Sequence, residues 1–156
     1  MSKTHDFTSH IRWTGNIGHG NASYKGYECR WQVAAPGKPV IECSNDPVLG
    51  GDPTLHNPED MLINAISACH ILWYLHLAFQ SEVVVLGYED SPVGHGESAP
   101  SGVGRFIGAT LWPVIRLAAG TDDQAAEAVH GDIHGVCFIA RSVNFLVTCE
   151  ARYLHG

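Results

Sequence analysis

Five cysteines are the side chains of this chain that are best suited to covalent chemistry. Their number is odd and no two of them form a Cys-x-x-Cys pair, so neither a disulfide framework nor a thioredoxin-type motif is expected. Cys29 and Cys149 fall in the apolar phase of predicted strands and are expected to be structural. Cys43, at the end of a strand, is ambiguous but also fits a structural role. Cys69 and Cys137 lie in the two predicted helices.

Cys69 lies inside the longest predicted helix, which we expect to run from Pro58 to about Gln80. Asn57 is a good N-cap, and Glu59 suits the positive end of the helix. The helix is apolar nearly all round, which predicts burial on several sides. It is long enough to resemble a membrane span, but it carries polar residues and has no basic flank, so we expect a core helix and no membrane association. Taken alone, a cysteine in such a helix also fits core filling.

Cys137 belongs to a stripe of residues on the second predicted helix, at spacings of three and four. Residues at such spacings lie on one narrow side of a helix. The stripe leaves three interpretations open: a solvated helix edge, a thiol whose pKa is lowered by a neighbouring cation, and a metal site. The ligands of that metal site would be His130, His134 and Cys137, joined by Cys69 or His70.

Length and composition bound the classes of protein that this chain could represent. It has 156 residues, of which 45% are hydrophobic and 16% charged, and its formal net charge is −7. These values predict one globular domain over residues 1–156 and exclude a disordered chain. The acidic balance, with basic residues that never form a run, argues against nucleic-acid binding. The first residues do not lead into a signal-peptide core, so we expect a cytoplasmic protein.

The remaining elements are strands and one more helix. Apolar and polar residues alternate in several segments, and turn residues separate these segments. The pattern predicts strands around 11–13, 27–33, 39–43, 82–89, 105–117 and 143–153, with a loop over 91–104. A capping box over 121–124 opens the second helix, whose apolar face would be Ala126, Val129, Ile133, Val136 and Ala140. The order of strands, helix, strands, helix and strand predicts an α+β fold.

Two motifs in the correct order resemble those of the OsmC/Ohr family of thiol peroxidases. The first is Asn57-Pro58-Glu59-Asp60-Met61-Leu62 followed by Ser67-Ala68-Cys69-His70, which is similar to the family's Asn-Pro-Glu-Glu/Asp-Leu and Ala-Cys segment. The second is His134-Gly135-Val136-Cys137 followed by Ser142-Val143-Asn144, which is similar to the segment of the family's second cysteine. The resemblance covers nearly the whole chain.

The resemblance implies a thiol-dependent reductase of organic hydroperoxides that acts in defence against oxidative stress. Cys69 would be the peroxidatic cysteine, Cys137 the resolving cysteine, and Glu59 a further residue of the active site. The implied fold has antiparallel strands around two central helices in an intertwined homodimer. The implied substrate is an organic hydroperoxide, and the reductant is an external dithiol, with no metal or other cofactor.

The spacing of Glu59 and Cys69 bears on the dimer. Ten residues of a straight helix rise by about 15 Å. The two side chains of one subunit therefore do not easily share a small site. If both act in one site, we expect Glu59 to come from the other subunit.

The chain departs from the family in the loop before Asn57. Relatives carry an arginine there that pairs with the glutamate and points to the thiolate, whereas this chain has Val48-Leu49-Gly50-Gly51-Asp52. Arg141 and Arg30 are the candidates to replace it. Without a nearby cation a thiol stays largely protonated near neutral pH and reacts slowly. The alternative function is therefore a catalytically weak OsmC-like protein that binds a small molecule or acts in stress.

Overall fold

The computed structural model describes residues 3–156. The chain divides into two compact units, Met1–Met61, which is described from residue 3 onward, and Leu62–Gly156. The element order is three strands, a long helix, four strands, a second helix and two final strands, with two short 3-10 helices in addition. The prediction of an α+β fold is confirmed.

The first unit contains a three-stranded antiparallel sheet. Its strands are β1 (His10–Trp13), β2 (Trp31–Ala34) and β3 (Ile41–Cys43), in the order β1-β2-β3. The strand predicted over 27–33 begins only at Trp31, although backbone hydrogen bonds from Thr14 to Arg30 and from Glu28 to Gly15 continue the contact with β1. A Cβ atom on Gly15 would lie 1.7 Å from the carbonyl oxygen of Glu28, so this approach requires glycine.

The second unit holds two three-stranded sheets. One consists of β4 (Val85–Glu89), β7 (Val114–Leu117) and β9 (Arg152–His155), in the order β4-β7-β9. The other consists of β5 (Val93–Ser98), β6 (Gly104–Leu111) and β8 (Leu146–Cys149), in the order β5-β6-β8. Each sheet combines one antiparallel pair with one parallel pair. In the first sheet β4 and β7 are antiparallel and β7 and β9 are parallel, and in the second β5 and β6 are antiparallel and β6 and β8 are parallel.

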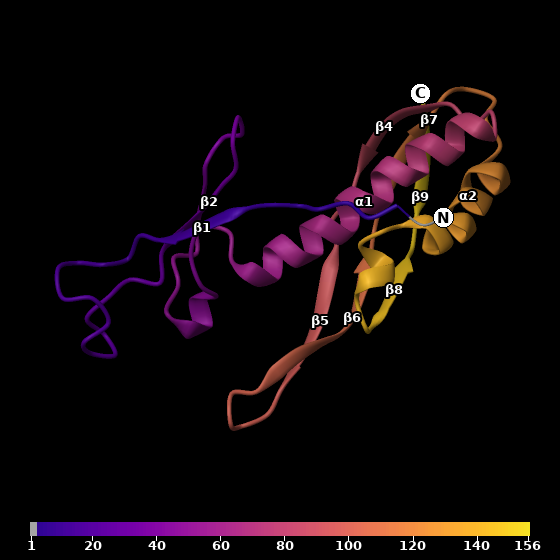
Figure 1. Ribbon diagram of the computed structural model, residues 1–156. Helices are drawn as coiled ribbons and strands as arrows, with labels where there is room; N and C mark the ends of the chain where they lie inside the picture. The colour runs from indigo at the N-terminus through magenta and orange to yellow at the C-terminus, as the bar shows by residue number, and fades with distance from the viewer. Residues whose placement is uncertain (1–2) are drawn as a thin grey trace. The chain divides into compact units, whose positions relative to one another are not determined.

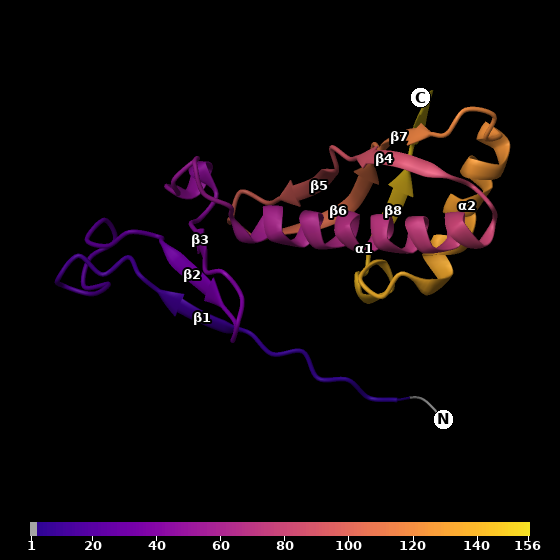
Figure 2. The ribbon, with the colours of Figure 1, turned by 90° about the horizontal axis from the view of Figure 1, so that it is seen from above.

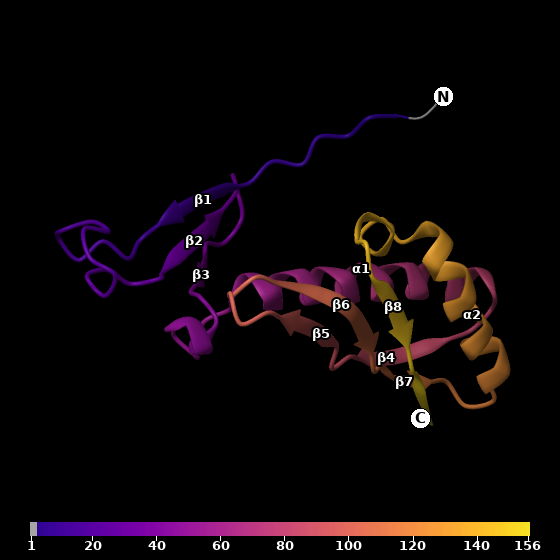
Figure 3. The ribbon, with the colours of Figure 1, turned by 90° about the horizontal axis from the view of Figure 1, so that it is seen from below.

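The helix α1 (Pro58–Gln80) has the bounds that the sequence predicts. Its start is a reciprocal cap, since the Asp60 N–H donates to Oδ1 of Asn57 at 2.7 Å and the Asn57 N–H donates to the Asp60 carboxylate at 3.3 Å. In the second unit α1 runs along the strands, and α2 (Asp123–Val136) lies beside its C-terminal half (Figures 1 and 2). The β5–β6 turn and α2 lie at opposite ends of this unit (Figure 3).

Within one chain α1 buries a stripe rather than its whole circumference. Its buried residues are Ile63, Ile66, His70, Tyr74 and Ala78, at spacings of three and four. Leu72 and Phe79, by contrast, are 68% and 81% exposed. The expectation of burial on several sides is therefore wrong for the single chain, because the core contacts only one side. By length and composition α1 could also cross a membrane, but its buried stripe is that of a helix packed on a core.

The hydrophobic core of the second unit has two parts, both built on α1. Toward its N-terminus Ile63 and Ile66 pack on Ala109 and Leu111 of β6. Toward its C-terminus the core joins α1, β7 and α2, and its buried members are Tyr74, Ala78, Val83, Ile115, Leu117, Ala126, Val129, Ile133, Cys137 and Ala140. This second part contains the surroundings of the candidate site.

Several element boundaries differ from those predicted. The single strand predicted over 105–117 is divided into β6 and β7 at Pro113, which has no N–H to donate to a sheet, and the final strand is divided into β8 and β9. The loop predicted over 91–104 contains β5, which pairs with β6. The cap of α2 is Asp122, whose side chain accepts from the Gln124 N–H at 3.0 Å, rather than the threonine before it.

Candidate functional site

The structure brings the thiols of Cys69 and Cys137 together. Cys69 lies in the middle of α1 and is half-buried, and Cys137 is the buried residue that follows the last turn of α2. Both cysteines are free, and they belong to the same core cluster. Burial raises the pKa of the Cys137 thiol, and a hydrogen bond with the Cys69 thiol raises that pKa further. Backbone N–H groups of Ala140 and Ile139 act on the pKa in the opposite direction.

Glu59 and the two candidate arginines lie on other elements or turns than the two thiols. Glu59 is exposed in the first turn of α1. Arg30 binds Asp52 at 2.7 Å and Glu28 at 3.3 Å, so it is held at the loop in which the resemblance expects an arginine. Arg141 is exposed in the short helix Ala140–Ser142, close in sequence to Cys137. Within residues 3–156, none of the hydrogen bonds or ion pairs joins a lysine or arginine to either thiol.

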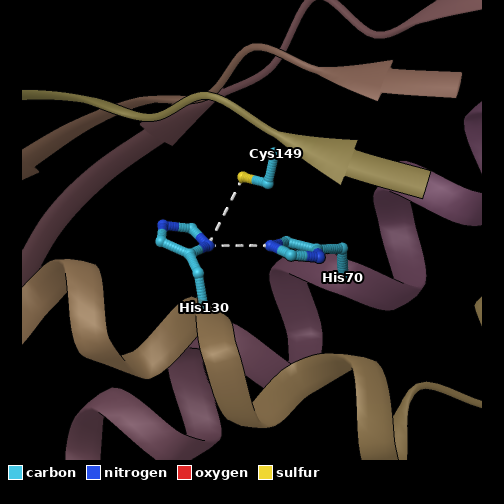
Figure 4. Close-up of side chains that lie close together, drawn as sticks. All are labelled: His70, His130 and Cys149. Atoms are coloured by element: carbon cyan, nitrogen blue, oxygen red, sulfur yellow. Dashed lines mark hydrogen bonds between the residues drawn. The ribbon is translucent and has the colours of Figure 1, made fainter. Parts of the chain in front are cut away.

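Beside the two thiols lies a second cluster, which we call the His-His-Cys triad: His70 of α1, His130 of α2 and Cys149 of β8 (Figure 4). Nε2 of His70 lies 3.0 Å from Nδ1 of His130, and Sγ of Cys149 lies 3.4 Å from the same Nδ1. One potential ligand atom from each residue lies within 4.8 Å of the other two. The triad thus combines three side chains of metal-binding type from three elements of the fold.

Aromatic packing fixes the orientation of His130. Its ring stacks on Tyr74 with a centroid distance of 4.5 Å, and the ring of His70 lies nearly parallel to it with a centroid distance of 5.2 Å. Tyr74 is itself fixed, because its hydroxyl donates to the carbonyl oxygen of Ala126 at 3.2 Å. Nε2 of His130 is buried and has no hydrogen-bond partner within residues 3–156. The hydrogen bonds of the triad therefore leave one polar atom of His130 unsatisfied.

The triad carries no charge at neutral pH. Burial lowers the pKa of His70 and of His130 to about 4, so both imidazoles are neutral. Burial also raises the pKa of Cys149 to about 12, and the carboxylates of Asp90, Glu127 and Glu150 raise it further. The electrostatic potential at the thiol is therefore negative.

A cavity of about 350 Å³ opens beside the triad. All three triad residues line it, together with Cys137, His134 and apolar side chains from α2 and β8. The buried thiol of the Cys69–Cys137 pair and the triad therefore share one cavity.

The set of ligands in the metal-site interpretation of the sequence differs from this arrangement. His134 and Cys137 line the cavity, but the ligand atoms that converge with His130 within the described residues belong to His70 and Cys149. The expected helical stripe ends early because α2 stops at Val136. Cys149, expected to be merely structural, belongs to the triad, and no local spacing could reveal this because its partners come from two distant helices.

The chain is similar to known proteins in its fold. The sequence matches no protein-family model and no curated protein. Among solved structures, an OsmC-like protein of unknown function from Vibrio cholerae is similar over 95% of this chain and 99% of its own, with a TM-score of 0.85 and 23% identity.

Two further solved structures are named organic hydroperoxide resistance proteins. The one from Legionella pneumophila matches 97% of this chain and 98% of its own, with a TM-score of 0.67 and 16% identity. The one from Elizabethkingia anophelis matches all of both chains, with a TM-score of 0.70 and 13% identity. The chain therefore has the fold of the OsmC-like and organic hydroperoxide resistance proteins.

Proposed function

We propose that this protein is a thiol-dependent reductase of organic hydroperoxides that acts in defence against oxidative stress. The observation that carries the proposal is the hydrogen-bonded pair of free thiols, Cys69 and Cys137. Two thiols from distant parts of the chain in direct contact are what a two-cysteine mechanism requires. The names of the Legionella and Elizabethkingia proteins support the same substrate class.

The reaction divides into two steps on the protein. The thiolate of Cys69 attacks the peroxide oxygen distant from the organic group, the O–O bond breaks, and the alkoxide takes up a proton and leaves as an alcohol. Cys69 is then a sulfenic acid. The Cys137 sulfur attacks the sulfenic sulfur, water leaves, and a disulfide forms. An external dithiol reduces this disulfide and restores both thiols, so no metal or other cofactor is required for the cycle.

The raised pKa of Cys137 supports this division of roles. A thiol whose pKa is raised is a poor first nucleophile, because it is the thiolate that attacks. Cys69 is the better exposed of the two residues and is therefore the one that a peroxide would reach first. Cys137, buried against it, is placed to resolve the sulfenic acid.

The proposal includes a homodimer in which Glu59 of the partner subunit completes the site. The exposed apolar side chains of α1, Leu72, Leu75 and Phe79, provide a surface that a second copy of the chain could cover. Glu59 would hold the cation that supports the thiolate, with Arg30 or Arg141 in that role. The reducing cytoplasm would supply the dithiol.

The alternative is a small-molecule-binding protein that has this fold without appreciable peroxidase activity. It is favoured by the cavity of about 350 Å³ and by the lack of a lysine or arginine bound to either thiol within the described residues. A binder would lose its thiols to peroxide only at the background rate.

Stopped-flow oxidation of the reduced protein by cumene hydroperoxide and by hydrogen peroxide, followed by intact-mass analysis, tests the proposal. Wild type is expected to lose two hydrogens rapidly, and more rapidly with the organic peroxide. Cys137→Ser is expected to stop at a trapped sulfenic acid, and Cys69→Ser to react at the background rate. Cys29→Ser, which changes a half-buried cysteine outside the thiol pair, is the matched control. Rapid oxidation that persists in Cys69→Ser would contradict the proposal.

The contribution of the arginines is tested in the same assay. Arg30→Ala and Arg141→Ala each remove one candidate cation. The variant that lacks the supporting cation is expected to slow the attack of Cys69 on the peroxide and to leave disulfide formation from the sulfenic acid unchanged. Equal rates in both variants and wild type would show that neither arginine supports the thiolate.

A further inference from the structure

Hydrogen bonding does not fully account for the convergence of the three atoms of the His-His-Cys triad. Nδ1 of His130 faces both Nε2 of His70 and Sγ of Cys149. A ring nitrogen offers either one hydrogen or one lone pair, so Nδ1 cannot make a full hydrogen bond to both neighbours. A metal ion, by contrast, would accept one lone pair from each of the three atoms.

The two distances that involve His130 are close to those of a tetrahedral metal centre. Bonds of about 2.0 Å from zinc to nitrogen and about 2.3 Å to sulfur imply nitrogen–nitrogen edges of about 3.3 Å and nitrogen–sulfur edges of about 3.6 Å. The corresponding separations here are 3.0 Å and 3.4 Å. The ligand atoms of His70 and Cys149 lie within 4.8 Å of each other. A small movement of the three side chains would therefore bring all three atoms within bonding distance of one ion.

The charges around the triad also favour a cation. Asp90, Glu127 and Glu150 act on the Cys149 thiol, and no lysine or arginine within residues 3–156 acts on it. Asp90 is fixed by two hydrogen bonds, from the Ser67 hydroxyl and from the Trp112 N–H at 2.7 Å. A bound divalent ion would balance this negative potential and that of the Cys149 thiolate.

We propose that His70, His130 and Cys149 form a zinc-binding site. Two imidazoles and a thiolate suit zinc rather than calcium or magnesium, which prefer oxygen ligands. On binding, the Cys149 thiol releases its proton to solvent and the sulfur bonds to the metal. The cavity beside the triad leaves room for water as a fourth ligand, so the site has the open position of a zinc centre with three protein ligands.

Zinc titration of the chelator-stripped, reduced protein against a competing indicator tests the site, with Co²⁺ as a spectroscopic substitute. We expect one equivalent to bind, with the visible bands of tetrahedral cobalt and a thiolate-to-cobalt charge-transfer band in the near ultraviolet. Cys149→Ser is expected to abolish the charge-transfer band and to weaken zinc binding by at least about tenfold. His130→Gln is expected to weaken binding similarly.

Two control variants make the test specific. Cys137→Ser changes the thiol that lines the same cavity, and Cys29→Ser changes one away from it; both are expected to retain the charge-transfer band. Circular dichroism of the metal-free variants checks that each is folded. Loss of the band in Cys137→Ser with retention in Cys149→Ser would assign the metal to the other thiol and overturn the proposal, as would the absence of stoichiometric binding. Neither outcome bears on the oxidation of Cys69, which is measured on metal-free protein.

Discussion

Two histidines of the triad, His70, which is buried, and His130, which is half-buried, make the metal-free protein sensitive to mild acid. Burial holds the pKa of His70 and of His130 at about 4, below their ordinary value. As the pH falls, the unfolded chain binds protons at these positions before the folded chain does, and the unfolded state is favoured. The stabilising contribution is therefore fully present above about pH 6.5 and is lost as the pH falls toward 4.

The magnitude follows from the two pKa values of each histidine. The pKa of each histidine shifts from about 6.5 in the unfolded chain to about 4 in the folded chain. Between pH 7 and pH 5 each shift therefore lowers the free energy of unfolding by about 2 kcal/mol, and the pair lowers it by about 4 kcal/mol. Urea unfolding at both pH values measures this loss, in the presence of a chelator and at constant protein concentration. A double variant, His70→Phe with His130→Phe, cannot bind these protons and retains an aromatic ring at the stacking positions.

The double variant is expected to lose about 4 kcal/mol less than wild type over this range. His76→Gln, which changes an exposed histidine of the same helix, is the matched control and is expected to behave as wild type. An equal loss of stability in wild type and in the double variant would refute the assignment of neutral histidines to the triad.

Three further changes test the fold by urea or thermal unfolding. Ile66→Ala, at a fully buried position of α1, is expected to destabilise the protein by about 2–5 kcal/mol, and a loss below about 1 kcal/mol would contradict its place in the core. Gly94→Ala would place Cβ 2.5 Å from the ring of Phe106 and is expected to cost about 1–3 kcal/mol; no loss would show that the hairpin opens freely there. Asp122→Ala removes the cap on Gln124 and is expected to cost about 1 kcal/mol, whereas Asp122→Asn should retain most of that stability.

Local signals predict the elements of this fold well where they are strong. The Asn57 cap and the proline after it fix the start of α1, and the apolar spacing of Ala126, Val129 and Ile133 identifies the buried side of α2. The division of one predicted strand at Pro113 could have been foreseen, because proline interrupts a central strand.

Other features depend on tertiary contacts that no local pattern contains. The strand β5 has glycines at alternate positions, a composition that is typical of a loop, and it forms a strand because it pairs with β6. Gly94 is needed because the side chains of Ile63 and Phe106 approach its backbone. The two thiols were identified from motif resemblance, whereas the triad arises only when α1, α2 and β8 are assembled. A pattern along the sequence can show which residues could bind a metal but not which of them meet.

The adjacent residues Cys69 and His70 connect the thiol pair to the triad. Successive residues of a helix point about 100° apart, so α1 directs one side chain to Cys137 and the next to His130 and Cys149. A metal bound by His70 would fix the rotation of α1 about its axis, and with it the direction of the Cys69 thiol. Conversely, a disulfide between Cys69 and Cys137 would hold the same helix against the end of α2, on the cavity that the triad lines. The oxidation state of the thiols and the occupancy of the triad would therefore act on one structural variable, the position of α1 relative to α2.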